Sequence, residues 1–342
     1  MAAGERTLIL AEGFSADPHY GKTMRGVLRY RRNDVVAILD STRVGERDAG
    51  VPVVGDVEGA LAYGPEVAIV GVATQGGRFP PEWRDILRAC IASGLSIENG
   101  LHEMLADDPE LRPLADAAGV ELRDLRRPPE GLDCATGANL DIDSRIVLTV
   151  ASDCAVGKMT VSLELDRAAR ERGLESLFVP TGQTGIAIAG WGIAVDAVVA
   201  DFISGAAEQL VIEGHRRGGE LLWVEGQGSL VHPAYSGVTL GLYHGSVPHA
   251  LVLCHRAGST EIEGSPGHPI PPLRELVELH ERMALPRRPA RVAALALNTA
   301  GLGEREAREV VAAASDETGL PAADPVREGA DALLDAVLAG LP

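Results

Sequence analysis

The chain has 342 residues, a hydrophobic fraction of 46%, a charged fraction of 23% and a formal net charge of −18 at pH 7. This length predicts about two domains, and the excess of carboxylates argues against nucleic acid and membrane surfaces as partners. The sequence shows no zinc-ligand spacing, no signal-peptide pattern and no membrane-spanning run, so a cytoplasmic protein is expected.

The first part of the chain alternates short apolar runs with helical patterns, which predicts βαβ units and a mostly parallel sheet. No GxGxxG motif follows the first run, where Glu12-Gly13-Phe14-Ser15-Ala16 stands instead. For this first part of the chain, a scaffold or oligomerisation role is therefore favoured over dinucleotide binding. Gly21-Lys22-Thr23 is interpreted as the start of a helix. Strands are predicted at 7–10, 34–39, 51–54 and 66–72, and helices at 22–31 and 81–93.

A proline-rich stretch separates two parts of the sequence. Residues 122–130 include Arg126-Arg127-Pro128-Pro129, and the two prolines favour an extended linker over a helix. We therefore predict an N-terminal domain at 1–130 and a C-terminal domain at 131–342. In the second domain, strands are predicted at 145–150, 176–179, 221–224, 250–254 and 292–297, and helices at 160–172, 196–217, 271–284, 303–316 and 327–339.

A phosphate-binding motif follows the strand at 145–150. A strand, a tight loop, Gly157-Lys158 and a helix succeed one another, which is the context that a P-loop requires. Backbone N–H groups of such a loop and the positive end of the helix dipole bind phosphate oxygens, and Lys158 adds a point charge. The candidate phosphate-binding residues are Ser152, Asp153, Cys154, Ala155, Val156, Gly157, Lys158, Met159 and Thr160.

The motif departs from the usual P-loop at two positions. Ser152 replaces its first glycine, and Met159 stands where Ser or Thr normally binds Mg²⁺. Thr160 comes one residue later, but adjacent helical positions point about 100° apart. The sequence therefore predicts a loop that binds phosphate without a metal ion. The alternative interpretation is a polar start of a helix that binds no ligand. Cys154 fits either an activated thiol or a small residue that fills a tight loop.

An acidic residue ends the strand at 221–224, as in a Walker-B strand. Glu225 would hold Mg²⁺ in an NTPase, or act as a general base on an amine in acyl transfer. A solvated carboxylate at a strand end is the third interpretation. Gln227 lies in the Gly-Gln-Gly loop that follows, where the backbone comes close to a ligand.

Several other polar residues stand where strands end or helices begin. A Gly-rich turn at 181–185 would line a substrate or stabilise an oxyanion, or be a structural turn. The remaining residues each have a structural alternative: a helix cap for Asp201, a turn for Asn298 in place of a purine contact, and a hydrogen-bonded core position for His255. The candidate substrate-binding residues are Thr181, Gly182, Gln183, Thr184, Asp201, Gln227 and His255. No metal site is predicted.

Four segments together resemble a two-domain P-loop family that includes D-glutamate N-acetyltransferases of D-amino-acid metabolism. They are 152–160, 180–185, 224–233 and 240–244. The second domain is also similar to dethiobiotin synthetase, whose Asp-x-x-Val-Gly-Lys loop is matched by Asp153, Val156, Gly157 and Lys158. That enzyme has Thr where this chain has Met159.

The resemblance implies an α/β protein, with a Rossmann-like N-terminal domain followed by a P-loop NTPase-like domain with a mostly parallel sheet. It further implies an N-acyltransferase that uses acetyl-CoA and a small amino acid such as D-glutamate, with Glu225 and Lys158 as catalytic residues and Asn298 at the adenine. The alternatives are an ATP-dependent ligase or kinase that uses ATP with Mg²⁺, and a nucleotide-binding regulator without turnover. A homo-oligomer is expected from the size and from the first domain, to which the sequence assigns no ligand.

Overall fold

The computed structural model describes residues 4–17 and 20–342 and divides the chain into two compact units. Unit 1 combines the chain up to Pro128 with Gly182–Ala197, and unit 2 combines Pro129–Thr181 with Val198–Pro342. The first division lies close to the predicted linker, but residues 182–197, which the sequence assigned to the second domain, pack in unit 1. Within the described ranges, no helix has the length and apolar character needed to span a bilayer.

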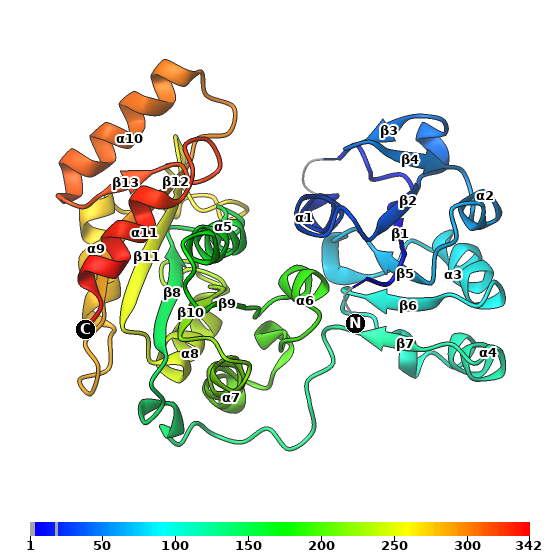
Figure 1. The fold of residues 1–342 in the computed structure, drawn as a ribbon, viewed down its shortest axis with the longest axis horizontal. Helices are drawn as coiled ribbons and strands as arrows, with labels where there is room; N and C mark the ends of the chain where they lie inside the picture. Colours follow the sequence, from blue (N-terminus) through cyan, green and yellow to red (C-terminus); the bar gives the residue numbers. More distant parts are fainter. Residues whose placement is uncertain (1–3, 18–19) are drawn as a thin grey trace. The chain divides into compact units, whose positions relative to one another are not determined.

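Unit 1 is a Rossmann-like layer structure with helices on both faces of one sheet (Figure 1). The strand order is β3-β4-β2-β1-β5-β6-β7, and all pairs are parallel except β3 with β4. The strands are β1 (Thr7–Leu10), β2 (Val35–Leu39), β3 (Arg47–Asp48), β4 (Val51–Val54), β5 (Val67–Val70), β6 (Ser96–Asn99) and β7 (Leu122–Asp124). The helices are α1 (Lys22–Tyr30), α2 (Val57–Leu61), α3 (Trp83–Ala92), α4 (Leu111–Ala118) and α6 (Gln183–Ala189).

The predicted linker is in part a strand. Leu122–Asp124 forms β7 at the edge of the sheet, and all three of its residues are half-buried. A three-residue edge strand has no apolar run, so its composition resembles that of a loop. The sequence analysis also gave no prediction for β6 and α4, which precede β7.

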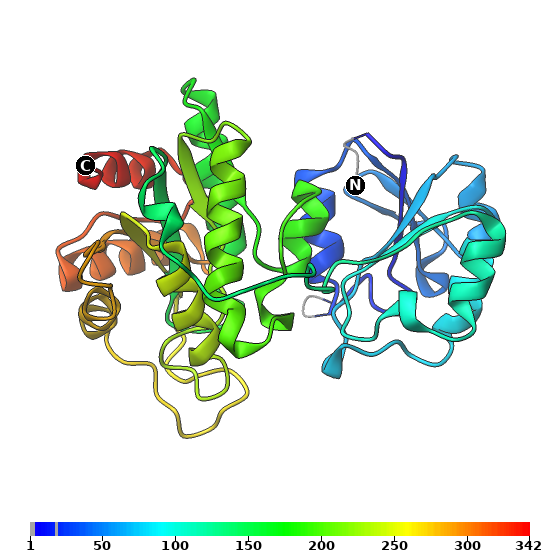
Figure 2. The ribbon, with the colours of Figure 1, turned by 90° about the horizontal axis from the view of Figure 1, so that it is seen from below.

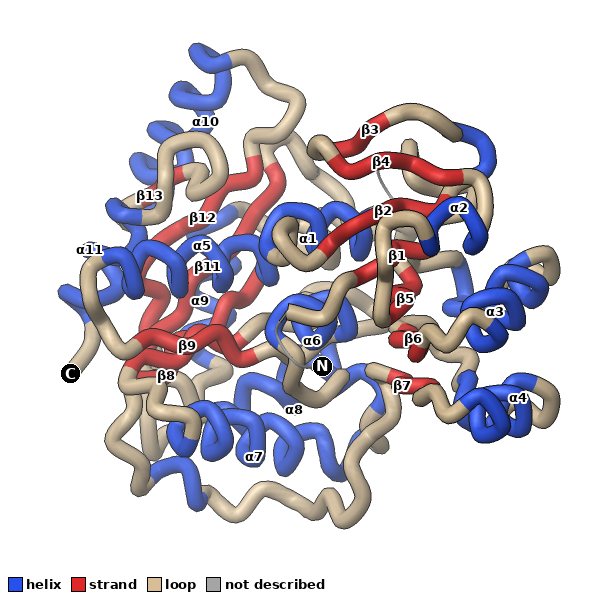
Figure 3. The backbone as a smooth tube through the Cα atoms, turned by 45° about the vertical axis from the view of Figure 1, so that its right-hand side comes forward, coloured by secondary structure: helices blue, strands red, loops and turns tan. Residues whose placement is uncertain are grey.

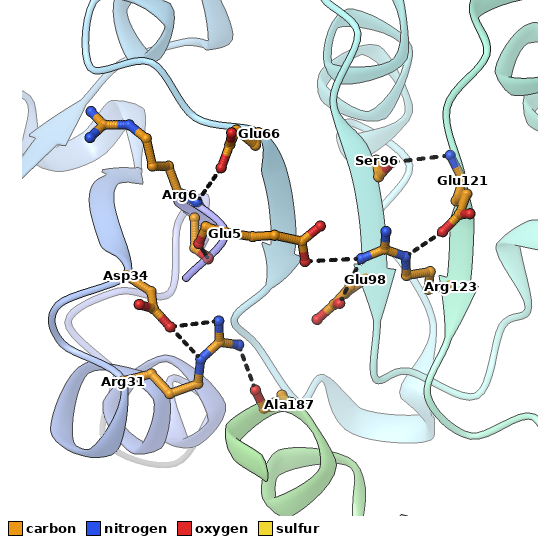
Figure 4. Close-up of polar contacts among 11 residues, drawn as sticks. Glu5, Arg6, Arg31, Asp34, Glu66, Ser96, Glu98, Glu121, Arg123 and Ala187 are labelled. Carbon is orange, nitrogen blue, oxygen red and sulfur yellow. Dashed lines mark hydrogen bonds and ion pairs between the residues drawn. The ribbon is translucent and has the colours of Figure 1, made fainter. Parts of the chain in front are cut away.

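Helix α6 comes from far along the chain and covers one face of the unit 1 sheet beside α1 (Figure 3). The hydroxyls of Thr23 and Thr184 lie 2.9 Å apart, and the Arg31 guanidinium donates to the Ala187 carbonyl at 2.8 Å (Figure 4). Arg31 also forms an ion pair with Asp34 at 2.9 Å. These buried contacts explain why residues 182–197 belong to unit 1.

Asp40, at the end of β2, occupies the place where a dinucleotide-binding fold presents an acid to a ribose. Here both of its carboxylate oxygens accept hydrogen bonds from the chain itself, from the backbone N–H groups of Gly13, Ser15 and Thr42 and from two hydroxyls. Burial raises the pKa of Asp40, but the bonds from Ser15 and Thr42 outweigh burial and lower it. The carboxylate thus fixes the first loop of unit 1.

Unit 2 has a fully parallel sheet with the order β13-β12-β11-β8-β10-β9. Helices α5 and α11 pack on one face, and α7, α8 and α9 on the other (Figures 1 and 2). The strands are β8 (Arg145–Ala151), β9 (Ser176–Val179), β10 (Leu221–Val224), β11 (Ala250–Arg256), β12 (Arg291–Asn298) and β13 (Ala322–Ala323). The helices are α5 (Lys158–Glu171), α7 (Ile203–Arg216), α8 (Ser236–Ser246), α9 (Leu273–Arg282), α10 (Glu304–Thr318) and α11 (Asp331–Gly340).

Candidate functional site

The site of unit 2 lies at the carboxyl ends of its central strands. Because β8, β10, β11 and β12 are parallel, their ends meet at one edge of the sheet, where such folds bind ligands. This edge carries Ser152, Glu225, His255 and Asn298, each at or just after the end of its strand. The structure therefore brings together residues that are up to 146 positions apart in the sequence.

The loop between β8 and α5 has the backbone of an anion-binding turn. Ala155 has φ 54° and Gly157 has φ 121°, so the chain enters the left-handed region twice before the helix begins. Asp153 fixes this shape, since its two carboxylate oxygens accept the N–H groups of Cys154 at 2.6 Å and Glu263 at 2.8 Å. The result is a concave loop at the N-terminus of a 14-residue helix.

Backbone donors in this loop are available to a ligand. Among the residues that the structure describes, the N–H groups of Ala155, Gly157 and Lys158 donate to no other group. A helix N-terminus leaves such groups unsatisfied and adds a positive dipole end, so phosphate oxygens are the ligands that it favours. The loop thus offers three backbone donors to an anionic ligand.

Lys158 is the first residue of α5, and its side chain folds over the loop. Its ammonium donates to the Asp153 carbonyl at 2.9 Å, and only 7% of the residue is exposed. Burial lowers the pKa of Lys158, while the nearby groups Cys154, Asp153 and Glu225 oppose this shift. A phosphate would provide this buried ammonium with the anionic partner that best compensates for its lost hydration.

Glu225 is held by the end of the neighbouring strand β9. Thr181 donates its backbone N–H to Glu225 Oε2 at 3.0 Å and its hydroxyl to the Glu225 carbonyl at 2.5 Å. The Gln227 amide in turn donates to the Thr181 hydroxyl at 3.1 Å. These bonds orient a carboxylate that is only 5% exposed. Three predicted residues thus form one network, and it lies within charge-interaction range of Lys158.

Gly226 allows the strand end to pass directly under Lys158. A Cβ atom there would lie 1.8 Å from the Thr149 carbonyl oxygen and 2.9 Å from Lys158 Cδ. We therefore expect Gly226→Ala to lower the free energy of unfolding by about 1–3 kcal/mol, as overpacking does, and to weaken phosphate binding because Lys158 is displaced. Gly237→Ala is the control, since the space around Gly237 is open. Urea unfolding of both variants tests this, and equal stability would contradict it.

His255 in β11 and Asn298 in β12 form hydrogen bonds with residues of the loop. The Ser152 hydroxyl lies 2.9 Å from His255 Nδ1, and burial lowers the pKa of His255. The Asn298 amide donates to the Val156 carbonyl at 3.3 Å and accepts the Ala300 N–H at 3.1 Å. Both side chains hold the loop in this structure, which agrees with the structural alternatives for them. Asn298 still has one amide N–H to offer a base.

The three hydrogen bonds that orient Glu225 involve none of the other predicted residues Asp201, 182–184, Met159 and Thr160. Asp201 is exposed in the short turn before α7, where its carbonyl accepts a weak bond from the Cys134 thiol. Thr181 belongs to unit 2, whereas Gly182, Gln183 and Thr184 belong to unit 1. Met159 and Thr160 are half-buried in the first turn of α5. The predicted Gly-rich cluster at 181–185 is therefore divided between the two units.

The structure adds loop contacts that the sequence analysis did not identify. The Ser229 hydroxyl donates to the Ser152 carbonyl at 3.0 Å, and the Arg256 guanidinium donates to the Ala155 carbonyl at 2.9 Å. His232 lies close enough that one of its ring nitrogens, a carboxylate oxygen of Asp153 and Cys154 Sγ are all within 4.8 Å of one another. Ser229 and His232 fall inside the 224–233 segment that carried the family resemblance, so position in that segment was the available signal.

Comparison with known proteins agrees with this architecture. Residues 133–334 match a family model described as a domain of unknown function, the DUF1611_C P-loop domain, and residues 40–128 match the DUF1611_N Rossmann-like domain. A crystal structure of a DUF1611 family protein from Anabaena variabilis superposes with a TM-score of 0.91 at 43% identity, over 98% of this chain and 99% of that one.

Two curated relatives have a described activity. A D-glutamate N-acetyltransferase of Tritonibacter scottomollicae is 39% identical over 288 residues, which is 83% of this chain and 84% of the relative. A D-glutamate N-acetyltransferase of Pseudoalteromonas sp. is 37% identical over 276 residues, or 80% and 82%. These relatives support an enzyme of the N-acetyltransferase class. Together the matches confirm the resemblance: the chain belongs to the DUF1611 family, with a Rossmann-like domain followed by a P-loop domain.

Proposed function

We propose that this protein transfers an acetyl group from acetyl-CoA to the amine of a small amino acid, with D-glutamate as the first acceptor to test. The observation that carries this proposal is the loop at 152–160, which offers unpaired N–H groups and Lys158 to phosphate while Met159 replaces the usual Mg²⁺ ligand. Coenzyme A carries phosphates, and acyl transfer from its thioester requires no metal. The names of the curated relatives favour the same acceptor.

Each residue of the network has a role in this reaction. The loop and Lys158 bind a phosphate of the acyl donor, and Glu225 removes a proton from the substrate ammonium so that the amine can attack the thioester carbonyl. The tetrahedral intermediate then collapses: the carbon–sulfur bond breaks, the CoA thiolate leaves, and the thiolate takes up the second proton that the nitrogen loses as the amide forms. Because Glu225 lies near Lys158, this role requires the pantetheine arm to turn back toward the end of β10.

The backbone also limits where an oxyanion can be stabilised. The N–H of Gly226 already donates to the Thr149 hydroxyl at 2.9 Å, so it is not available to a tetrahedral intermediate. An oxyanion donor must therefore come from elsewhere.

The test is a panel of D- and L-amino acids with acetyl-CoA and EDTA, in which the N-acetyl product is identified by mass spectrometry. The proposal expects acetylation of D-glutamate and little product from L-glutamate. If no amine is acetylated, the proposal fails. Phosphate release from ATP with Mg²⁺ and the same panel would then support the ligase or kinase alternative.

A further inference from the structure

The histidine beside the phosphate loop has one ring nitrogen that forms no hydrogen bond with any residue that the structure describes. His232 is only 5% exposed, and its ring packs against the Tyr235 ring at a tilt of 37° with centroids 4.5 Å apart. Its Nδ1 accepts the Ala234 backbone N–H at 3.1 Å. In the described part of the chain, Nε2 has no hydrogen-bond partner, although a ring nitrogen of His232 lies within 4.8 Å of Asp153 and Cys154 atoms in the loop.

The contact at Nδ1 fixes the tautomer of the ring. An imidazole nitrogen that accepts a hydrogen bond carries no proton, so the proton of the neutral ring is on Nε2. The Ala234 N–H and the adjacent Tyr235 ring hold this arrangement in place. His232 therefore presents an N–H donor, and no free lone pair, from its second nitrogen.

This tautomer decides among three roles for the cluster of Asp153, Cys154 and His232. A metal ligand needs a lone pair on the coordinating nitrogen, and the other nitrogen usually carries a proton. If Nε2 bound a metal, the proton would be on Nδ1 and would face the Ala234 N–H, which excludes this role. A general base at Nε2 needs the same lone pair. A hydrogen-bond donor needs only the proton that is present. Asp153 is not the acceptor in this structure, because no hydrogen bond joins it to His232; its oxygens accept the N–H groups of Cys154 and Glu263.

We infer that His232 is a neutral hydrogen-bond donor of the phosphate loop and that its Nε2–H binds a phosphate oxygen of the acyl donor. This inference rests on the proposed function. A ring nitrogen of His232 lies within 4.8 Å of Cys154 Sγ, and Ala155, Gly157 and Lys158 follow Cys154 in the same loop, so we expect a phosphate bound by the loop to come within reach of His232 as well. A buried, rigid donor loses little entropy on binding, and its bond to an anion is charge-assisted.

The experiment measures coenzyme A affinity by calorimetry for matched substitutions. His232→Leu is expected to weaken binding about 10- to 100-fold, as loss of a hydrogen bond to a charged group does. His232→Gln keeps most of the affinity because its amide N–H reaches the place of Nε2, whereas His232→Asn loses affinity because its shorter amide does not. His244→Leu is the control and keeps wild-type affinity, because His244 Nε2 instead lies 2.9 Å from the Met283 carbonyl.

Three results would overturn the inference. If His232→Leu binds coenzyme A as tightly as the wild type while Lys158→Ala does not, the inference fails and the proposed function stands. If the wild type binds no coenzyme A, the proposed function fails, and the inference that rests on it fails as well. If Co²⁺ gives a thiolate charge-transfer band that disappears in His232→Leu, the cluster is a metal site. If the leucine variant does not fold, the Gln and Asn variants replace it in the comparison. Equal coenzyme A affinity of these two variants would then overturn the inference.

Discussion

Replacing Lys158 by alanine is expected to weaken coenzyme A binding roughly 100-fold, because a phosphate loses a buried, charge-assisted donor. The fold should survive. The hydrogen bond that the Lys158 ammonium makes goes to a backbone carbonyl, that of Asp153, so the substitution removes no ion pair. Far-UV circular dichroism and calorimetry of the variant measure both effects.

The chain supplies a matched control for this substitution. It has two lysines, and Lys22 also stands in a Gly-Lys pair, at the start of α1 in unit 1. Lys22→Ala should leave coenzyme A affinity unchanged, since Lys22 begins α1 in unit 1, whereas the loop at 152–160 belongs to unit 2. Equal losses in the two variants would mean that Lys158 has no specific role at a phosphate.

Replacing Glu225 by glutamine is expected to lower turnover by about 10²–10⁴-fold, the range that removal of a general base gives, with little change in coenzyme A affinity. Glutamine keeps the volume of the side chain and still accepts the Thr181 N–H through its amide oxygen. What it loses is the ability to take a proton. The acidic limb of the pH–rate profile should disappear with the base.

The control for Glu225 is another buried carboxylate of unit 2. Glu208 in α7 is 5% exposed and accepts hydrogen bonds from Thr136 and from the Ala138 N–H. Glu208→Gln should affect stability and leave turnover unchanged. If Glu225→Gln instead lowers affinity and turnover equally, Glu225 binds the ligand or supports the loop and is not the base.

Continuous apolar strands were predictable from the sequence because they are buried on both faces. The strands Ser176–Val179 and Leu221–Val224 have the bounds that the apolar runs predicted. Helix α8 was missed for the opposite reason. It contains three glycines, and added Cβ atoms at Gly241 and Gly245 would lie 2.7 Å from Ile203 and 2.1 Å from the Ser204 carbonyl oxygen. Close packing on α7 requires these glycines, although they lower helix propensity.

The candidate site also has a part that the sequence could predict and a part that it could not. The loop at 152–160 could be predicted because strand, loop and helix are adjacent in the sequence. The bonds from Thr181 to Glu225 and the approach of His232 to Asp153 depend on strand order, which no local pattern encodes. The assignment of α6 to unit 1 is also non-local: its contacts with Thr23 and Arg31 join residues more than 150 positions apart.

The most direct test of the central claim is release of free thiol from acetyl-CoA, measured in EDTA with D-glutamate as acceptor, for the wild type and for Lys158→Ala. Thiol release that depends on D-glutamate, persists without metal and falls steeply in the variant is the predicted result. Release that requires added Mg²⁺ and ATP, or that is equal in both proteins, would contradict a metal-free acetyl transfer that depends on the loop at 152–160.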